Sequence, residues 1–308
     1  MASSDARGAD VPAEEAFRSG FVAIVGRPNV GKSTLLNGLV GEKVAIVSRR
    51  PQTTRRRILG IVTTEAAQAV LVDTPGIHKP RTTLGRHMVS AARHSLPDAD
   101  VVLFVVDVSV APTDEDRAVA GMVRAAAGPV VLALNKSDLL APADVVAHTA
   151  AYSELAAAER WMLVAAIDGH NLDLLWGMVV TLLPPGPLFY PPEQLSDQTD
   201  RVLAAELVRE AALRQLRQEV PHGIDVVVTD WQVQPNGVVH IGALVIVERE
   251  SHKGIVIGAG GRTIKAVGAS ARRAIERMLT GRVYLELQVK VRTGWRDSAA
   301  ELKRLGYS

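Results

Sequence analysis

The segment that most constrains this chain is GRPNVGKS, residues 26–33. It follows an apolar run at residues 21–25 and leads into residues 34–39, whose apolar spacing is helical. The order of strand, glycine-bounded loop and helix is what a phosphate-binding P-loop requires. A loop without bulky side chains can turn successive backbone N–H groups toward a triphosphate at the start of a helix. We therefore predict a nucleotide-binding α/β domain, rather than a helix entry whose glycines only make a tight turn.

Each residue type in this loop has a role in phosphate binding. Lys32 is expected to reach the β- and γ-phosphates, and the Ser33 hydroxyl is expected to ligate Mg²⁺. The predicted nucleotide contacts of the loop are Gly26, Arg27, Pro28, Asn29, Val30, Gly31, Lys32, Ser33 and Thr34.

Length and composition limit the classes of protein to which the chain can belong. The 308 residues are 47% hydrophobic, enough for two cores. Cysteine is absent, which excludes disulfide scaffolds, thiolate metal sites and cysteine nucleophiles and is compatible with a reducing cytoplasm. No apolar run approaches the roughly 18 residues of a membrane-spanning helix. Residues 1–18 combine small and acidic residues without a signal-peptide core, and we predict a disordered tail there.

Residues 49–57, RRPQTTRRR, are predicted to form a mobile loop, because Pro51 and two threonines disfavour both a helix and a regular strand. In a nucleotide switch one threonine must meet Mg²⁺ and the γ-phosphate. Thr54 is the candidate and Thr53 the alternative. The arginines of this segment are either solvated or face phosphate or RNA, and the sequence leaves the two open. Residues 58–63 and 69–72 are predicted to be neighbouring strands.

A second phosphate element is DTPG, beginning at Asp73, which follows an apolar strand. Asp73 is expected at the carboxyl end of that strand, where it can hold a Mg²⁺-bound water, while the Gly76 N–H contacts the γ-phosphate. Thr74 and Pro75 belong to the same contact segment. Ras-like enzymes place a water-orienting glutamine at the position of Ile77, which cannot do that work. The neighbouring His78 is either catalytic or an exposed switch residue.

Base recognition is predicted at NKSD, which comprises Asn135, Lys136, Ser137 and Asp138. It follows residues 130–134, which, like residues 101–106, read as a strand buried on both faces. The Asp138 carboxylate has two acceptor oxygens that can pair with the N1–H and exocyclic amine of guanine and would leave adenine unsatisfied. Farther on, Ala165 stands where such domains usually carry serine, and the Ala166 N–H could bond guanine O6.

The proline-rich residues 184–199 are predicted to be a linker between a nucleotide-binding domain at 19–183 and a second domain at 200–308. Residues 1–200 hold 18 Lys and Arg against 22 Asp and Glu, whereas residues 201–308 hold 17 against 11. This excess favours a polyanionic partner for the second domain. A helix at 200–220, strands at 224–229, 238–248 and 283–291, and a helix ending near residue 279 are expected there.

Residues 258–261 satisfy G-x-x-G directly before that long helix, with Ile264 and Lys265 behind it. This is the signature of a KH domain, whose bare loop lets a single-stranded RNA backbone approach closely. The predicted RNA contacts are Lys253, Ile257, Gly258, Ala259, Gly260, Gly261, Arg262, Lys265, Arg272 and Arg273.

Together these motifs resemble the bacterial Era GTPase family of the TrmE-Era-EngA group. The likeness extends from about Gly20 to the ending at Gly294-Trp295 and Leu305-Gly306-Tyr307. The resemblance implies a type II KH domain, binding near the 3′ end of small-subunit ribosomal RNA, a role in assembling the 30S subunit, and loose association with the inner membrane. A monomer is expected. Relatives with a hydrophobic residue at the Ile77 position often use K⁺ held by the P-loop asparagine, here Asn29.

The predicted chemistry is hydrolysis of GTP to GDP and phosphate with Mg²⁺, in which Lys32, Thr54 and Gly76 position phosphate and water and no general base is identified. Nucleotide binding is predicted to change the interdomain contact and open the RNA groove. Three alternatives remain open at this point. They are a P-loop small-molecule kinase, a tRNA-modification GTPase, and a structural RNA-binding protein with an inactive GTPase domain.

Overall fold

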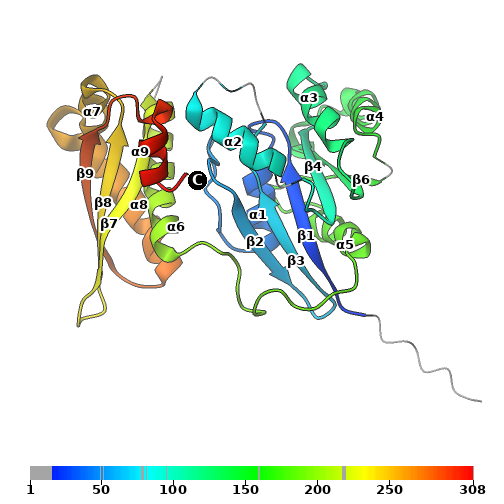
Figure 1. Ribbon diagram of the computed structural model, residues 1–308, viewed down its shortest axis with the longest axis horizontal. Coiled ribbons are helices and arrows are strands. Elements are labelled where there is room, and N and C mark those ends of the chain that lie inside the picture. Colours follow the sequence, from blue (N-terminus) through cyan, green and yellow to red (C-terminus); the bar gives the residue numbers. More distant parts are fainter. Residues whose placement is uncertain are drawn as a thin grey trace, which may run out of the picture.

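The computed structural model describes residues 16–48, 50, 52–77, 80, 82–94, 96–158, 160–216 and 220–307. Two lobes lie side by side, and the chain passes from the first to the second along one edge (Figure 1). The first lobe ends with helix α5 (Leu172–Leu182), and the second begins with helix α6 (Asp200–Gln215).

The first lobe is built on a six-stranded sheet in the order β2-β3-β1-β4-β5-β6. All neighbouring strands are parallel except β2 and β3, which are antiparallel. The predicted, mostly parallel sheet is therefore confirmed. Its strands are β1 (Arg18–Val25), β2 (Ile58–Thr63), β3 (Ala67–Asp73), β4 (Val101–Asp107), β5 (Val130–Asn135) and β6 (Arg160–Leu163).

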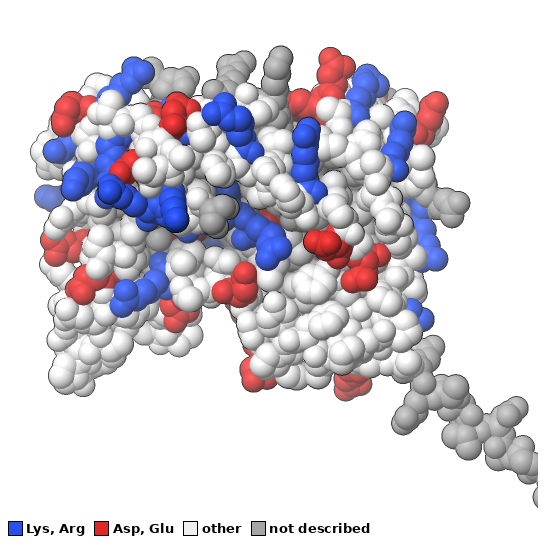
Figure 2. Space-filling model, viewed as in Figure 1, with Lys and Arg blue, Asp and Glu red and all other residues white. Residues whose placement is uncertain are grey.

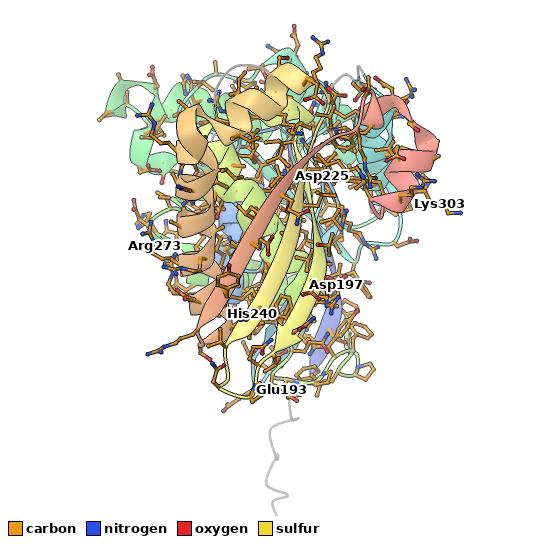
Figure 3. All side chains as sticks on the ribbon, turned by 90° about the vertical axis from the view of Figure 1, so that its left-hand side faces the viewer. Glu193, Asp197, Asp225, His240, Arg273 and Lys303 are labelled. Atoms are coloured by element: carbon orange, nitrogen blue, oxygen red, sulfur yellow. The ribbon has the colours of Figure 1, made fainter. Side chains whose placement is uncertain are left out.

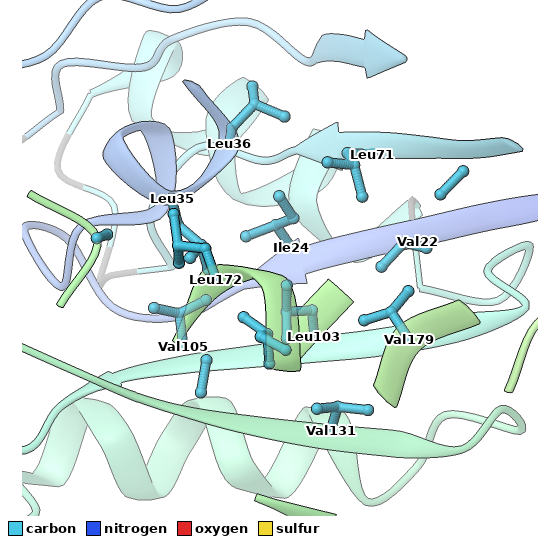
Figure 4. Packing of buried hydrophobic residues seen from close by; sticks show 14 of the residues in the cluster. Val22, Ile24, Leu35, Leu36, Leu71, Leu103, Val105, Val131, Leu172 and Val179 are labelled. Atoms are coloured by element: carbon cyan, nitrogen blue, oxygen red, sulfur yellow. The ribbon is translucent and has the colours of Figure 1, made fainter. Parts of the chain in front are cut away.

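Helices cover both faces of this sheet, which is why its central strands are continuous apolar runs. Leucines of α1 and α5 pack with inward side chains of β1, β3 and β4 on one face (Figure 4). The other face is covered by α2, α3 and α4. The helices are α1 (Lys32–Val40), α2 (Thr83–His94), α3 (Asp114–Val123), α4 (Val145–Ala156) and α5.

The second lobe has a three-stranded sheet in the order β7-β8-β9, with β7 antiparallel and β9 parallel to the central strand. Apolar residues of α6 and α8 pack on one face of it. The C-terminal α9 and Trp295 cover part of the opposite face. The remaining elements are β7 (Asp225–Val233), β8 (Val239–Val247), α7 (Glu250–Ile257), α8 (Arg262–Leu279), β9 (Val283–Val291) and α9 (Ala299–Arg304).

Several predicted boundaries differ from the structure. The helix predicted over 200–220 ends at Gln215, because Leu216 takes an extended conformation with ψ 151 and is buried in the core of the second lobe. Most of the predicted tail lies outside the described residues, but Arg18 already begins β1, where it pairs with Ala67 and Pro185. The helix α9 was not predicted. No helix among the described residues is both long and apolar enough to cross a membrane.

The proline-rich segment between the lobes is fastened to the first sheet. Ile61 N–H donates to Leu195 O at 2.9 Å and Ser196 Oγ donates to Leu59 O at 2.7 Å, so the segment runs along the edge strand β2. Fully buried Gln68 on β3 accepts from the N–H groups of Phe189 and Tyr190 at 2.7 and 3.0 Å and donates to Tyr190 O at 2.9 Å. One side chain therefore holds the middle of the segment.

We expect Gln68→Ala to release this segment. The substitution removes the partners of two backbone N–H groups and one carbonyl, a cost of about 2–3 kcal/mol in the free energy of unfolding. Urea unfolding measures that loss, and chymotrypsin should cut faster after Phe189. Gln232→Ala on β7, where the side chain is exposed, is the control and should stay within about 0.5 kcal/mol of the parent. Equal cleavage rates for the two variants would contradict the role of Gln68.

Candidate functional site

The P-loop connects β1 to α1, and two of its glycines are required by close contacts. Gly31 has φ 101, and a Cβ there would lie 2.3 Å from the side-chain nitrogen of Asn135. A Cβ on Gly26 would lie 2.3 Å from the Val105 carbonyl oxygen. A side chain at either position would push the loop out of shape. The loop therefore keeps a bare backbone at the N-terminus of α1, which is the place for an anion.

Lys32 is buried, with 6% of its surface exposed, and its ammonium donates to the carbonyls of Gly26 and Arg27 at 3.0 Å each. Burial lowers the pKa of Lys32 from 10.5 to about 8, although the nearby charge of Asp73 opposes the shift. An ammonium destabilised in this way gains from a phosphate counter-charge. Lys32 is thus placed where a phosphate would restore its usual protonation.

Three oxygen donors converge behind Lys32. The hydroxyls of Ser33 and Thr54 are 2.7 Å apart, and they donate to Asp73 Oδ2 at 2.7 and 3.2 Å. Burial raises the pKa of Asp73, whose other oxygen has no partner among the described residues. Hard oxygen donors beside a buried, unpaired carboxylate oxygen fit Mg²⁺. No cluster of three His, Asp or Glu side chains forms a metal site in the described ranges, so the remaining ligands would be phosphate and water oxygens.

The two candidate switch threonines have different surroundings. Thr53 Oγ1 donates to Arg50 O at 2.7 Å, away from Asp73, whereas Thr54 joins the oxygen cluster. Gly76 lies against the P-loop, where a Cβ would come within 2.8 Å of Pro28. Ile77 is 4% exposed and packs in the core beneath α2 and α3, so its side chain is withdrawn from the phosphate site. His78, an open catalytic alternative, lies outside the described residues.

The base-recognition segment forms a pocket lined by Ser137, Asp138, Ala165, Asp168, Gly169 and His170. Asn135 ties it to the P-loop, because its amide donates to Val30 O at 2.7 Å and accepts from the Ala166 N–H at 3.0 Å. The Ala166 N–H predicted for guanine O6 is thus already bonded, and a base would have to share it. Asp138 is exposed at the mouth of this pocket.

A charge network beside the pocket was not predicted. Arg27 of the P-loop donates to the fully buried carboxylate of Asp116 on α3 at 3.0 Å. Lys136 donates to Asp107 at 2.5 Å, and Asp107 lies 3.9 Å from Arg27. Desolvation alone would raise the pKa of Asp107, but bonds from Lys136 and Ser109 hold it below the usual value. The sequence indicated only Arg27 and Lys136, because these two belong to the P-loop and NKSD motifs. Asp107 and Asp116 lie outside both motifs and far from the P-loop in sequence, so no pattern predicted them.

The G-x-x-G segment joins α7 to α8. Gly258, Gly260 and Gly261 all have positive φ, and a Cβ on Gly258 would lie 2.2 Å from Thr263 Oγ1. The four predicted cations of α8 are exposed, and Figure 3 shows Arg273 pointing away from the sheet. Along the same helix, partly buried Ile264 lies on the apolar side. The predicted loop geometry and the charged flank of α8 are therefore both present. The exposed cations of that flank are Arg262, Lys265, Arg272 and Arg273.

Of the three arginines after Thr54, Arg57 is exposed, whereas Arg55 and Arg56 neither point to solvent nor face the nucleotide. Arg55 is 4% exposed and donates to Ile224 O and His222 O of the second lobe at 2.6 and 3.0 Å. Arg56 donates to Leu305 O and lies over the Tyr307 ring. For these two side chains both interpretations drawn from the sequence are wrong. They bind backbone carbonyls of the second lobe instead.

Side chains of the second lobe also bind the first lobe. Arg209 of α6 is fully buried, donates to Thr53 O, and pairs with Glu206. Burial would raise the pKa of Glu206, but the charge and hydrogen bond of Arg209 outweigh it and hold that pKa below its usual value. Glu210 of the same helix accepts from the Val47 N–H at 3.0 Å and pairs with Lys43.

Comparisons with known proteins give matches to both lobes of the chain. A family model described as a 50S ribosome-binding GTPase matches residues 21–136, and one described as a KH domain matches residues 219–296. GTPase Era of Ruminiclostridium cellulolyticum is 42% identical over 291 residues, covering 94% of this chain and 98% of that relative. GTPase Era of Clostridium botulinum is 46% identical over 292 residues, with the same shares. The chain belongs to the Era family of GTPases.

Solved Era structures share this architecture across both lobes. Era in complex with MgGDPNP and nucleotides 1506–1542 of 16S ribosomal RNA has a TM-score of 0.91 and 37% identity, covering 95% of this chain and 99% of that one. A variant of Aquifex aeolicus Era bound to GDP and AlF₄⁻ has a TM-score of 0.90 and 37% identity, with 95% and 100% covered. The predicted family, the GTPase and KH folds and the GTPase activity are confirmed. Membership in the Era family decides against a small-molecule kinase and a tRNA-modification GTPase.

The buried ammonium of Lys32 gives a pH prediction. Its folded pKa of about 8 lies below the usual lysine pKa of 10.5, so between these limits the folded protein has lost a proton that the unfolded chain retains. Stability must then rise with pH in this interval, by about 1 kcal/mol per pH unit relative to a variant without the group. Urea unfolding of the nucleotide-free protein and of Lys32→Met should show this growing difference. Bound GDP should abolish this dependence on pH. A difference in unfolding free energy that stays constant with pH in the absence of nucleotide would contradict the lowered pKa of Lys32.

Proposed function

We propose that this protein is a Mg²⁺-dependent GTP switch that binds 16S ribosomal RNA near its 3′ end and acts in assembly of the 30S subunit. The observation that carries the proposal is the position of Thr54. Its hydroxyl belongs to the Ser33–Asp73 oxygen cluster, while the Thr53 carbonyl before it and the Arg55 side chain after it are bound to the KH lobe. The relatives support both ligands, because one Era structure contains MgGDPNP together with a 16S RNA fragment.

In this proposal the P-loop holds the phosphates and the oxygen cluster holds the metal. Ser33 and Thr54 would be direct ligands of Mg²⁺, and Asp73 would act through a water. When bound, Mg²⁺ neutralises charge on the β- and γ-phosphates. Lys32 would bind the same oxygens, and the Gly76 N–H would hold the γ-phosphate. Asp138 and the Ala166 N–H would select guanine, with Ala165, Ser137 and Lys136 shaping the pocket.

Hydrolysis then relies on positioning and charge stabilisation. Ile77 is withdrawn into the core, so its side chain cannot orient water. Asn29 is exposed with φ 65 and lines the same cavity as Gly76 and Ser48. An amide oxygen at that place can hold a monovalent cation beside the phosphates, and we assign this role to Asn29. A phosphate-release assay with and without RNA separates this mechanism from an RNA-binding protein whose GTPase domain is inactive.

The RNA surface is assigned to the G-x-x-G segment and the adjoining helices. Gly258 to Gly261 carry no bulky side chain, so a sugar-phosphate backbone can come close. Ile257 and the partly buried strip containing Ile264 and Leu287 would accept bases. The predicted phosphate contacts are Lys253, Arg262, Lys265, Arg272 and Arg273. Lys and Arg also gather on the face around α9 and along the line between the lobes (Figure 2).

Nucleotide state and RNA binding are coupled through residues 53–55 in this proposal. Movement of Thr54 toward or away from the oxygen cluster would pull on the Arg209 bond to Thr53 and on the Arg55 bonds to the turn before β7. The switch helix α2 takes part, because Leu84 and Met88 pack with Trp295 and Leu305. A change at either switch is thus transmitted to the KH lobe.

We predict that RNA binds more tightly when the protein holds a non-hydrolysable GTP analogue than when it holds GDP, by about 5- to 100-fold. Arg209→Ala should bring that ratio close to one, because it removes the donor to Thr53 O. The measurement is fluorescence anisotropy with a labelled 16S 3′-end fragment in both nucleotide states.

Arg57→Ala is the matched control for this experiment. Arg57 lies in the same segment, but its side chain is exposed. The variant should therefore keep the parent ratio. Equal RNA affinity of the unmodified protein in the two nucleotide states would end the switch model, and a loss of coupling in Arg57→Ala would show that charge alone is responsible.

The assignment of Asn29 predicts a dependence on the monovalent cation. Turnover should be faster in K⁺ than in Na⁺, and Asn29→Ala should erase the difference by removing the amide oxygen. Phosphate release in the two salts is the readout. GTP affinity measured in parallel separates lost binding from lost hydrolysis, and identical parent rates in both salts would exclude the K⁺ site.

We also propose a monomer that works in the cytoplasm, with loose peripheral attachment to the inner face of the cell membrane. The family resemblance supports this. The basic residues that would meet an anionic surface are concentrated in residues 201–308.

A further inference from the structure

A groove of about 710 Å³ lies between α2 and α3, apart from the phosphate and base pockets. Its floor is apolar and includes Ile77, Val89 and Met122. Both flanking helices cover the same face of the first sheet (Figure 1). A volume of this size between two helices accommodates side chains of a docked segment.

The walls of this groove carry opposite charges. Arg86 and Arg93 line it from α2, while Asp114 and Glu115 line it from α3. Arg93 and Glu115 are exposed, and in the described part of the chain no ion pair crosses between the helices. Among the described residues, Arg86 donates to Thr83 Oγ1 and Asp114 pairs with Arg117 on its own helix at 3.5 Å. The charges of the two walls are thus available to an occupant.

We infer that this groove docks an amphipathic helix of a partner protein, with acidic side chains along one flank and basic side chains along the other. An apolar stripe on that helix would cover the floor, and each flank would meet the wall of opposite charge. A polyanion such as RNA does not fit, because Asp114 and Glu115 would repel it. The groove begins at Ile77, directly after Gly76 of the nucleotide site, so the partner would contact the switch itself.

The test uses three short helical peptides with one leucine stripe. The dipolar peptide carries Glu on one flank and Lys on the other, and the two comparison peptides carry Glu on both flanks or Lys on both. Binding to the full chain loaded with a non-hydrolysable GTP analogue is measured by fluorescence polarisation. The dipolar peptide should bind about tenfold more tightly than either comparison peptide. No binding of the dipolar peptide up to about 1 mM would overturn the inference.

Paired charge reversals locate the binding. Arg86→Glu combined with Arg93→Glu makes both walls acidic, so the Lys-flanked peptide should become the tightest binder. Asp114→Arg combined with Glu115→Arg makes both walls basic, so the Glu-flanked peptide should become the tightest. Arg160→Glu and Asp173→Arg, both exposed and outside the groove, should leave the ranking unchanged. A ranking that neither pair of groove substitutions alters would place the peptide elsewhere and reject the proposal. RNA is absent from this assay, so its outcome is independent of the RNA switch.

Discussion

The structure depends on the fact that Thr54 cannot move alone. Its hydroxyl lies 2.7 Å from Ser33 Oγ, the carbonyl of Thr53 accepts from Arg209, and the guanidinium of Arg55 donates to two carbonyls of the KH lobe. A backbone of three residues spans only about 10 Å. The hydroxyl that joins the oxygen cluster and the interlobe bonds therefore share one short piece of chain. A displacement of the Thr54 hydroxyl acts directly on the bonds that hold the KH lobe.

Burial makes this arrangement favour discrete states. Arg55, Arg209 and Asp225 are almost fully buried, and burial raises the pKa of Asp225 although Arg55 and Arg209 oppose the shift. A partial separation of the lobes would take Arg55 from its two carbonyls and Arg209 from Thr53 O while both stay shielded from water, which is costly. Full separation would hydrate the two guanidinium groups, and full docking restores their bonds. Intermediate positions are therefore disfavoured, as a switch requires.

The local part of this site could be predicted from sequence and the interlobe part could not. The P-loop, DTPG, NKSD and G-x-x-G segments are short motifs whose chemistry lies within a few residues, and the strands before the first three are continuous apolar runs. The fate of Arg55 depends on carbonyls at residues 222 and 224, and that of Arg27 on Asp116. Such contacts connect distant positions, and a run of arginines gives no indication of its partners. The early end of α6 has the same cause, because tertiary burial of Leu216 overrides its helical pattern.

The linker determines which motion remains. Its prolines predicted a linker between two domains, and in the structure Gln68 binds its middle while Asp197 Oδ1 accepts from the Leu59 N–H at 3.2 Å near its end. Thr199 then caps α6 by accepting from the Val202 N–H, and from there the chain belongs to the second lobe. Only Gln198 lies between the bond of Asp197 to the first lobe and the cap of α6 at Thr199, and its N–H donates to Ser196 Oγ at 3.2 Å. A pivot this short permits rotation of the KH lobe but little translation, so the bonds made by residues 53–56 and by α2 decide its orientation.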